Sequence, residues 1–299
     1  MTEGESVRRP GPSQARLLGL LAALVALQGF FPTPSAAQWP EGHGNWWAKV
    51  SAFHHRTTEQ FRADGDRRPF LNDDARSVSS AVFLDILVGV TDRLDLWAQV
   101  PWFHLRFDDV SDDRTSQGIG DIRLSARHTL VRLAGGAVPI SARYTAKVPV
   151  VDFPQDAEVI PVGEGQWDHE AWLEAGASFW PAPAYAVLWL GYRWRTLNED
   201  TTRDPGDERL LLAEVGGSVT SSLGGKLVLD GVFGTNGSIQ GLRVGSDARR
   251  IVYLQPALTW QATSSTALEV GARYPLAGKN FPAGTQWTVG LFHRGGGPR

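Results

Sequence analysis

The stretch Gly118–Val151 has the sequence GIGDIRLSARHTLVRLAGGAVPISARYTAKVPVV. It contains two segments in which polar and apolar residues alternate, joined by the short turn at 133–136. Alternation with a period of two places successive side chains on opposite faces of an extended strand. The stretch therefore predicts a β-hairpin with one apolar face and one charged face.

The charged face of this hairpin combines both signs of charge with hydroxyl groups. Its side chains are Asp121, Arg123, Ser125, Arg127 and Thr129 on the first strand and Ser141, Arg143, Thr145 and Lys147 on the second. In a soluble sandwich the apolar face points inward, whereas in an outer-membrane barrel it meets lipid and the charges line a wet lumen. The alternation alone does not distinguish these two folds.

Residues 1–37 have the features of a secretory signal peptide. Arg8, Arg9 and Arg16 form a basic start, an apolar run follows over 17–31, and small residues at 35–37 form a cleavage site. The run is shorter than the roughly 20 residues of a membrane-spanning helix. We therefore expect an exported chain with a barrel domain over 38–294 and a flexible tail over 295–299.

Composition excludes several classes of protein. The chain of 299 residues has a net charge of −3, which gives no indication of nucleic-acid binding. It contains no cysteine, so neither disulfides nor thiolate metal sites are available. Its 12 Trp are numerous, and Trp favours positions that are apolar at one end and wet at the other.

The alternating pattern continues through twelve predicted strands. They cover approximately 45–62, 77–90, 94–107, 121–132, 138–148, 167–180, 184–195, 210–220, 226–235, 249–261, 266–275 and 285–294. The connections between them alternate between long and short, as in membrane barrels with long loops at one rim and tight turns at the other. The even strand number also fits a bacterial barrel.

Closure of twelve strands decides which face points outward. A barrel of about eight strands already encloses all the side chains that a filled interior can hold, so a wider one cannot pack its apolar face inside. Interfacial aromatic residues are predicted near the long loops at Trp102, Trp167, Tyr192, Trp194, Tyr274 and Trp287, and near a short turn at Trp260. The predicted fold is an all-β, twelve-stranded, antiparallel up-and-down transmembrane barrel.

Charged residues of the inner face are the candidate lumen or constriction residues. They are Asp121, Arg123, Arg127, Arg143, Lys147, Asp168, Glu170, Glu174, Arg193, Glu214, Glu269 and Arg273. A basic row on the fourth and fifth strands neighbours an acidic row on the sixth, at a strand spacing of about 4.8 Å. Two interpretations remain open: an ion-pair network that fills and stiffens the barrel, or a constriction whose transverse field selects solutes.

Catalytic and metal-binding interpretations find less support. A lipid-modifying enzyme needs a His beside a Ser and an orienting third group; neither His128, near Ser125, nor His104 has such neighbours at strand spacing. His54 and His55 are adjacent, so a strand points them to opposite faces and a shared metal is not expected. No cofactor is predicted.

Three short motifs resemble the MetA-pathway phenol-degradation or transporter-like family of outer-membrane barrels. They are GIGDIRL at 118–124, GEGQWD at 163–168 and PLAGKN at 275–280. The resemblance implies a twelve-stranded outer-membrane barrel that moves small molecules, aromatic ones among them, and it brings no catalytic residues. One difference is that such barrels usually end on an aromatic residue, where this chain has Gly295.

The sequence thus predicts a passive channel for small solutes in the outer membrane of a Gram-negative-type bacterium. Its expected partners are outer-membrane lipid, the transported solutes and the barrel-assembly machinery, without nucleic acid. The alternative is a closed structural barrel whose loops at 108–117, 152–166 and 198–208 bind a partner.

Overall fold

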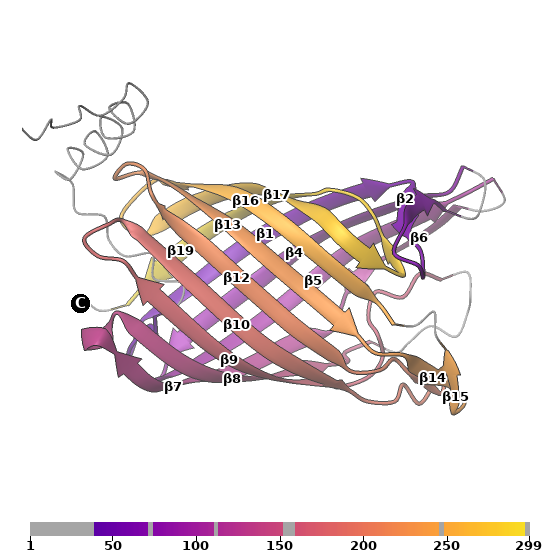
Figure 1. Cartoon of the computed structure of the whole chain (residues 1–299), viewed down its shortest axis with the longest axis horizontal. Helices are drawn as coiled ribbons and strands as arrows, with labels where there is room; N and C mark the ends of the chain where they lie inside the picture. Colours follow the sequence, from indigo (N-terminus) through magenta and orange to yellow (C-terminus); the bar gives the residue numbers. More distant parts are fainter. Residues whose placement is uncertain (1–38, 71–73, 111–112, 152–158, 245–247, 297–299) are drawn as a thin grey trace, which may run out of the picture. The chain divides into compact units, whose positions relative to one another are not determined.

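A computed structural model describes residues 39–70, 74–110, 113–151, 159–244 and 248–296. In this part of the chain twelve antiparallel strands form a closed barrel in which sequence neighbours are also neighbours in the sheet (Figure 1). The barrel strands are β1 (Trp46–Thr57), β4 (Arg76–Gly89), β5 (Leu94–Asp108), β7 (Ile122–Leu133), β8 (Val138–Val148), β9 (Asp168–Ser178), β10 (Ala184–Arg195), β12 (Glu208–Ser218), β13 (Leu223–Gly234), β16 (Arg250–Gln261), β17 (Thr266–Lys279) and β19 (Gln286–Gly295). Pairing of β1 with β4 and β19, and of β4 with β5, closes the ring. The predicted fold class is confirmed.

The prediction of an acidic loop over 108–117 is wrong for most of these residues. Strand β6 (Asp113–Ile119) pairs with residues 102–108 of β5, while β7 pairs with residues 94–99 of the same strand. Alternation continues through β6, but its polar side chains and the preceding acidic residues resemble a loop in composition. β5 and β6 therefore extend this wall beyond the end of β7.

Two small sheets of short strands lie at the long-loop rim. β18 (Phe281–Pro282) pairs with β2 (Glu59–Phe61), which pairs with β3 (Arg67–Pro69), and β14 (Gly237–Ile239) pairs with β11 (Arg203–Asp204) and β15 (Leu242–Val244). The predicted loop 198–208 accordingly contains β11 and the first residue of β12. At the other rim the connections are tight, as at η2 (Ala134–Gly136). No helix among the described residues is long and apolar enough to cross a membrane.

Of the two predicted terminal segments, only the C-terminal tail lies partly within the described residues. The predicted signal peptide, residues 1–37, lies outside the described residues. The predicted tail begins one residue too early, because Gly295 belongs to β19 and pairs with Trp46. A Cβ atom on Gly295 would lie 2.6 Å from Cε2 and Cζ2 of Trp46. The Trp46 indole thus covers the position that a side chain at residue 295 would occupy.

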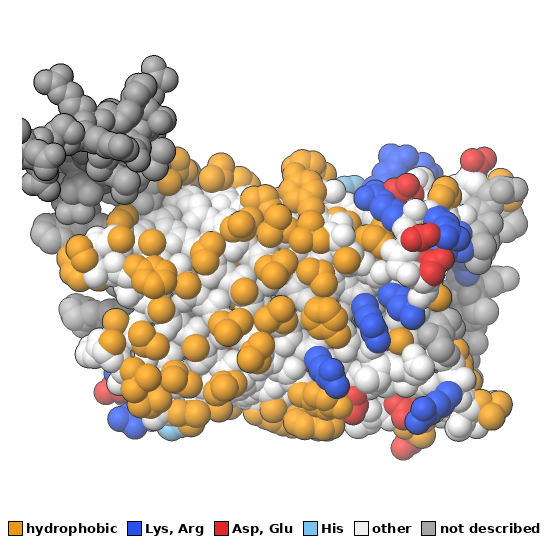
Figure 2. All heavy atoms as spheres, in the orientation of Figure 1, with side chains coloured by type: hydrophobic (Ala, Val, Ile, Leu, Met, Phe, Trp, Pro, Cys, Tyr) orange, Lys and Arg blue, Asp and Glu red, His pale blue; other side chains and the backbone are white. Residues whose placement is uncertain are grey.

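Apolar side chains cover the outer surface of the barrel, where Figure 2 shows them over its middle, with charged side chains towards the long-loop rim. Leu173 is 52% exposed, whereas Arg143 and Glu174 are 8% and 3% exposed. Of the predicted interfacial residues, Trp102, Trp167, Trp194, Tyr274, Trp287 and Trp260 are exposed and Tyr192 is half-buried. The apolar face therefore meets lipid and the charges lie inside, as an outer-membrane barrel requires.

Candidate functional site

The twelve predicted lumen residues all take part in polar contacts on the inner face. Several of these contacts bridge an intervening strand: Arg123 on β7 contacts Glu170 on β9, and Lys226 on β13 contacts Glu269 on β17 at 2.8 Å. Side chains that point inward from a closed sheet converge, so they can contact residues two strands away. The basic and acidic rows therefore pair with each other along the wall.

A first cluster lies near the short turns. Arg127 contacts Asp95 at 2.7 Å, and Arg143 contacts Glu174 at 2.5 Å. The Arg143 guanidinium also lies over three indole rings, with its carbon 5.4, 4.8 and 4.9 Å from the ring centres of Trp97, Trp172 and Trp189. Three rings and one carboxylate together fix this cation in place.

A longer ion-pair chain lies nearer the long loops. Glu170 pairs with both Arg123 and Arg193, and Arg193 continues to Glu208. Glu208 in turn pairs with Arg249 at 2.5 Å, just before β16 begins. The chain thus spans six strand steps of the wall, from β7 to the start of β16, through alternating charges.

Glu164 forms the centre of this network although it belongs to the loop between β8 and β9. Its carboxylate lies 2.6 Å from Lys147 Nζ on β8, 2.7 Å from Arg195 Nη2 on β10 and 2.9 Å from Arg249 Nη1. β8 and β16 are five steps apart in a ring of twelve strands, where six steps is the maximum. The loop therefore enters the lumen and bridges nearly opposite walls.

Backbone contacts hold this loop in place. The Glu164 N–H donates to Asp121 Oδ2 at 2.9 Å, and the Asn198 amide donates to the Glu164 carbonyl at 2.8 Å. A Cβ on Gly163 would lie 2.5 Å from Asp121 Oδ1, and one on Gly120 would lie 2.8 Å from the Val162 carbonyl. Glycine at both positions permits this close approach.

The electrostatic environment keeps Glu164 ionised. Burial alone would raise the pKa of its carboxyl, but the positive charges of Arg249, Arg195 and Lys147 hold this pKa well below its ordinary value of 4.5. The loop carboxylate is therefore charged wherever the barrel is folded at neutral pH.

The remaining predicted residues lie on the rest of the inner wall. Glu269 pairs with Lys49 at 3.1 Å and with Lys226, which also contacts Glu214 at 3.8 Å. Arg273 pairs with Asp230 and donates to Gln286 at 2.7 Å. Lys147 joins Asp121 and Asp168, each at 3.1 Å.

The first described residues contact the barrel near its short-turn rim. Trp39 donates from its indole to the Gly136 carbonyl at 3.3 Å, and the Glu41 N–H donates to Asp95 Oδ1 at 3.2 Å. Glu41 itself is only 5% exposed. Residues 39–41 therefore lie against the lumenal cluster formed by Asp95 and Arg127.

An aromatic arc lines the inner face on the first strands. The ring centres of Phe53 and Phe83 are 5.9 Å apart, and those of Phe83 and Phe103 are 6.0 Å apart. All three rings are half-buried although they point inward, whereas the inward Ala81 between them is 2% exposed. The inner surface thus divides into a packed ion-pair wall and an accessible aromatic arc.

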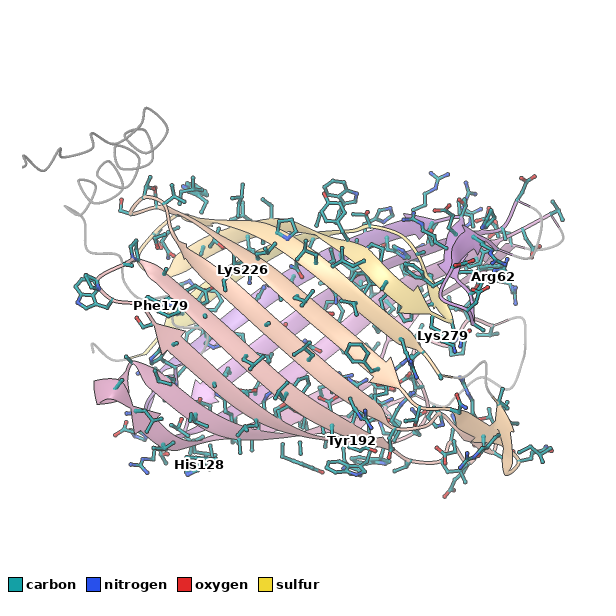
Figure 3. The ribbon with its side chains drawn as sticks, in the orientation of Figure 1. Arg62, His128, Phe179, Tyr192, Lys226 and Lys279 are labelled. Atoms are coloured by element: carbon teal, nitrogen blue, oxygen red, sulfur yellow. The ribbon has the colours of Figure 1, made fainter. Side chains whose placement is uncertain are left out.

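Sequence reasoning missed Glu164, Arg249, Glu208 and the aromatic arc as a group. Period-two alternation covers strands only, and Glu164 lies in a loop. Arg249 is the first residue of the predicted strand 249–261, whereas β16 begins at Arg250. The motif at 163–168 contains Glu164 and was the available signal for that loop. Of the histidines considered, His128 points outward (Figure 3) and Ser125 bonds Thr145 at 2.8 Å inside, whereas His54 Nδ1 lies 2.9 Å from the Ser80 hydroxyl, a Ser–His contact that the sequence did not predict.

Comparison with known proteins gives the family and the fold. The family model described as "Putative MetA-pathway of phenol degradation" matches residues 74–289. No curated protein has a matching sequence. Among solved structures, the COG4313 outer membrane channel from Pseudomonas putida F1 has 17% identity and a TM-score of 0.74, over 88% of this chain and 100% of that one.

Two further barrels are similar in fold at lower identity. The translocator domain of the autotransporter NalP from Neisseria meningitidis has 10% identity and a TM-score of 0.50, over 94% of this chain and 96% of its own. The NanC porin has 8% identity and a TM-score of 0.50, over 82% and 98%. At such identities the likeness is one of fold.

Proposed function

Because this chain belongs to the family described as "Putative MetA-pathway of phenol degradation", we propose that it is a passive outer-membrane channel for small solutes, including small aromatic molecules. The solute path follows the aromatic arc of Phe53, Phe83 and Phe103, beside the ion-pair wall. The twelve charged residues predicted from the sequence shape the constriction and its field, and no catalytic step is involved.

The observation that carries this proposal is the uneven exposure of the inner face. Asp168, Glu170 and Glu208 are at most 2% exposed, so these three carboxylates are packed against their ion-pair partners and cannot contact a solute. The inward rings of Phe53, Phe83 and Phe103 retain exposure, as do Ser51 and Ser79 beside them. This exposure supports a solute path along the arc.

The chemistry of the arc favours amphipathic solutes. Ring faces and edges stack favourably on aromatic solutes at centre distances of about 4.5–7 Å. The hydroxyl groups of Ser51, Ser79 and Thr288 share the inner face with the rings and can accept or donate hydrogen bonds. A solute with one ring and one hydroxyl group, such as a phenol, matches both features.

Refolded protein in planar bilayers tests the channel. We expect discrete single-channel currents. Relative to protein-free liposomes, the protein should accelerate entry of phenol more than entry of glucose, a polar solute without an aromatic ring. Phe83→Ala should lower phenol entry, while Leu84→Ala, on the lipid-facing side of the same strand, should not. Absence of current together with absence of phenol entry would reject the channel.

A closed barrel that binds a partner through its loops is the second candidate. The observation in its favour is the Glu164 bridge, which ties the loop across the lumen by three cations. Opening then requires either space beside the bridge or its release. A barrel that never conducts, even after Glu164→Gln, would support the closed form.

A further inference from the structure

Three basic side chains form one cross-strand row on the outer face of the barrel, at the long-loop rim. Arg209 on β12 pairs with Phe233 on β13, Phe233 pairs with Arg250 on β16, and Arg250 pairs with Lys279 on β17. With strands about 4.8 Å apart, the row spans roughly 15 Å. We refer to Arg209, Arg250 and Lys279 as the basic row.

The row points away from the lumen. Each of its members alternates with an inward residue, such as Glu208 before Arg209 and the buried Ile251 after Arg250. Arg209 and Arg250 are exposed, and Lys279 is half-buried. Figure 3 labels Lys279 at one end of this region and Tyr192, the ladder partner of Arg209, at the other.

Unlike most lumenal cations, the basic row has no carboxylate partner. Within the described ranges, no Asp or Glu lies in ion-pair contact with Arg209, Arg250 or Lys279. Asp207, two residues before Arg209, accepts hydrogen bonds from the Tyr192 hydroxyl and the Arg195 N–H instead. Three neighbouring positive charges are therefore available to an external anion.

Phe233 does not fill the space between the two guanidinium groups. A Cβ on Gly231 would lie 2.8 Å from Cε2 of the Phe233 ring. Because Gly231 precedes Phe233 by two residues on the same face, the ring lies along the strand towards the middle of the barrel. The ring therefore lies below the level of Arg209 and Arg250 and does not extend towards the rim between them.

The apolar band begins directly below the basic row. Leu211 and Val252 occupy the next outward positions after Arg209 and Arg250, and the neighbouring Leu190 on β10 is 50% exposed. Long loops mark the external rim of such barrels. A row of cations above this band therefore lies at the headgroup level of the outer leaflet.

We propose that the basic row binds the phosphate groups of a phosphorylated glycolipid of the outer leaflet, whose acyl chains lie on Leu190, Leu211 and Val252. Guanidinium groups bind phosphate oxygens through paired charge-assisted hydrogen bonds. The spacing of Arg209 and Arg250, about two strand widths, admits one phosphate between them, with Lys279 as a third donor.

Lipid binding to the purified full-length chain tests this site. The protein is refolded without lipid in detergent micelles and titrated with diphosphoryl lipid A, with the same lipid after removal of both phosphates, and with inorganic phosphate. The variants are Arg209→Gln combined with Arg250→Gln, and a control, Arg106→Gln, also exposed at the long-loop rim. Arg106 already pairs with Asp113 at 2.6 Å.

We expect diphosphoryl lipid A to bind the wild type at least tenfold more tightly than the dephosphorylated lipid. The double variant should lose about a hundredfold in affinity, roughly tenfold for each charge-assisted contact, and the control should change less than about twofold. Equal binding of both lipids, or an unchanged double variant, would overturn the proposal. Inorganic phosphate that competes fully at equal concentration would assign the row to free phosphate instead.

A folding control keeps the result interpretable. The exposed substitutions should leave the far-ultraviolet circular dichroism and the heat-dependent gel shift of the barrel unchanged. Should the double variant misfold, Lys279→Gln alone must still weaken diphosphoryl lipid A by about tenfold. These binding measurements are independent of conductance, so they hold whether or not the lumen conducts.

Discussion

The Glu164 carboxylate lies 2.9 Å from the Arg249 guanidinium, although the loop of Glu164 starts from a wall five strand steps away from β16. Through this contact, the loop between β8 and β9 crosses the lumen and connects two distant parts of the wall. Its removal should therefore change conduction more than any single substitution on the strands.

Glu164→Gln should open the lumen. The neutral amide no longer attracts Lys147, Arg195 and Arg249, so the loop loses its ionic contacts and the lumen loses one negative charge. We expect a single-channel conductance at least about twofold higher and a shift of selectivity towards anions, since three positive charges remain. The reversal potential in a salt gradient measures this shift. Glu199→Gln, in a neighbouring loop, serves as the control and should leave both values unchanged.

Gly163→Ala should reproduce the higher conductance by a steric route. Its Cβ would lie 2.5 Å from Asp121 Oδ1, so the loop must move away from β7. Gly225→Ala is the matched control, because its Cβ would meet only ordinary contacts of 3.6 and 3.7 Å. If Gly163→Ala conducts like the wild type, the loop tolerates displacement without opening the lumen.

The pH dependence of conductance should report Glu164. A carboxyl whose pKa is lowered in the folded state stabilises the docked loop above its ordinary pKa of 4.5, and this stabilisation is lost as the pH falls through the lowered value. Conductance should stay constant from pH 7 to 5 and rise only below 4.5. This rise in conductance below pH 4.5 should be absent in Glu164→Gln. A rise already at pH 6 would contradict the ionised bridge.

Neutralising Arg127 and Arg143 together should shift selectivity towards cations and destabilise the barrel. Replacement of both by Gln leaves Asp95 and Glu174 buried without their partners. Breaking such a buried pair costs about 3–5 kcal/mol in unfolding free energy. Urea unfolding of the refolded barrel measures the loss. Arg294→Gln, whose cation stacks on Phe292 near the end of the chain, should cost far less.

The pattern of residues determined the barrel and the direction of its faces. Alternation in β7 to β10 assigned Arg143 and Glu174 to one face and Leu173 to the other, because each strand residue has only two orientations. The strand number then excluded a filled apolar interior. The inward parity of Phe53, Phe83 and Phe103 is equally visible in the alternation of their strands.

Only the tertiary structure decided which inward groups meet. Asp95 pairs with Arg127 because β5 and β7 are in register, and Arg143 reaches three indoles from three other strands. Loops carry no period, so nothing in the alternation places Glu164 between β8 and β16. Closure of the sheet brings residues far apart in the chain within reach of one carboxylate, and that convergence exists only in three dimensions.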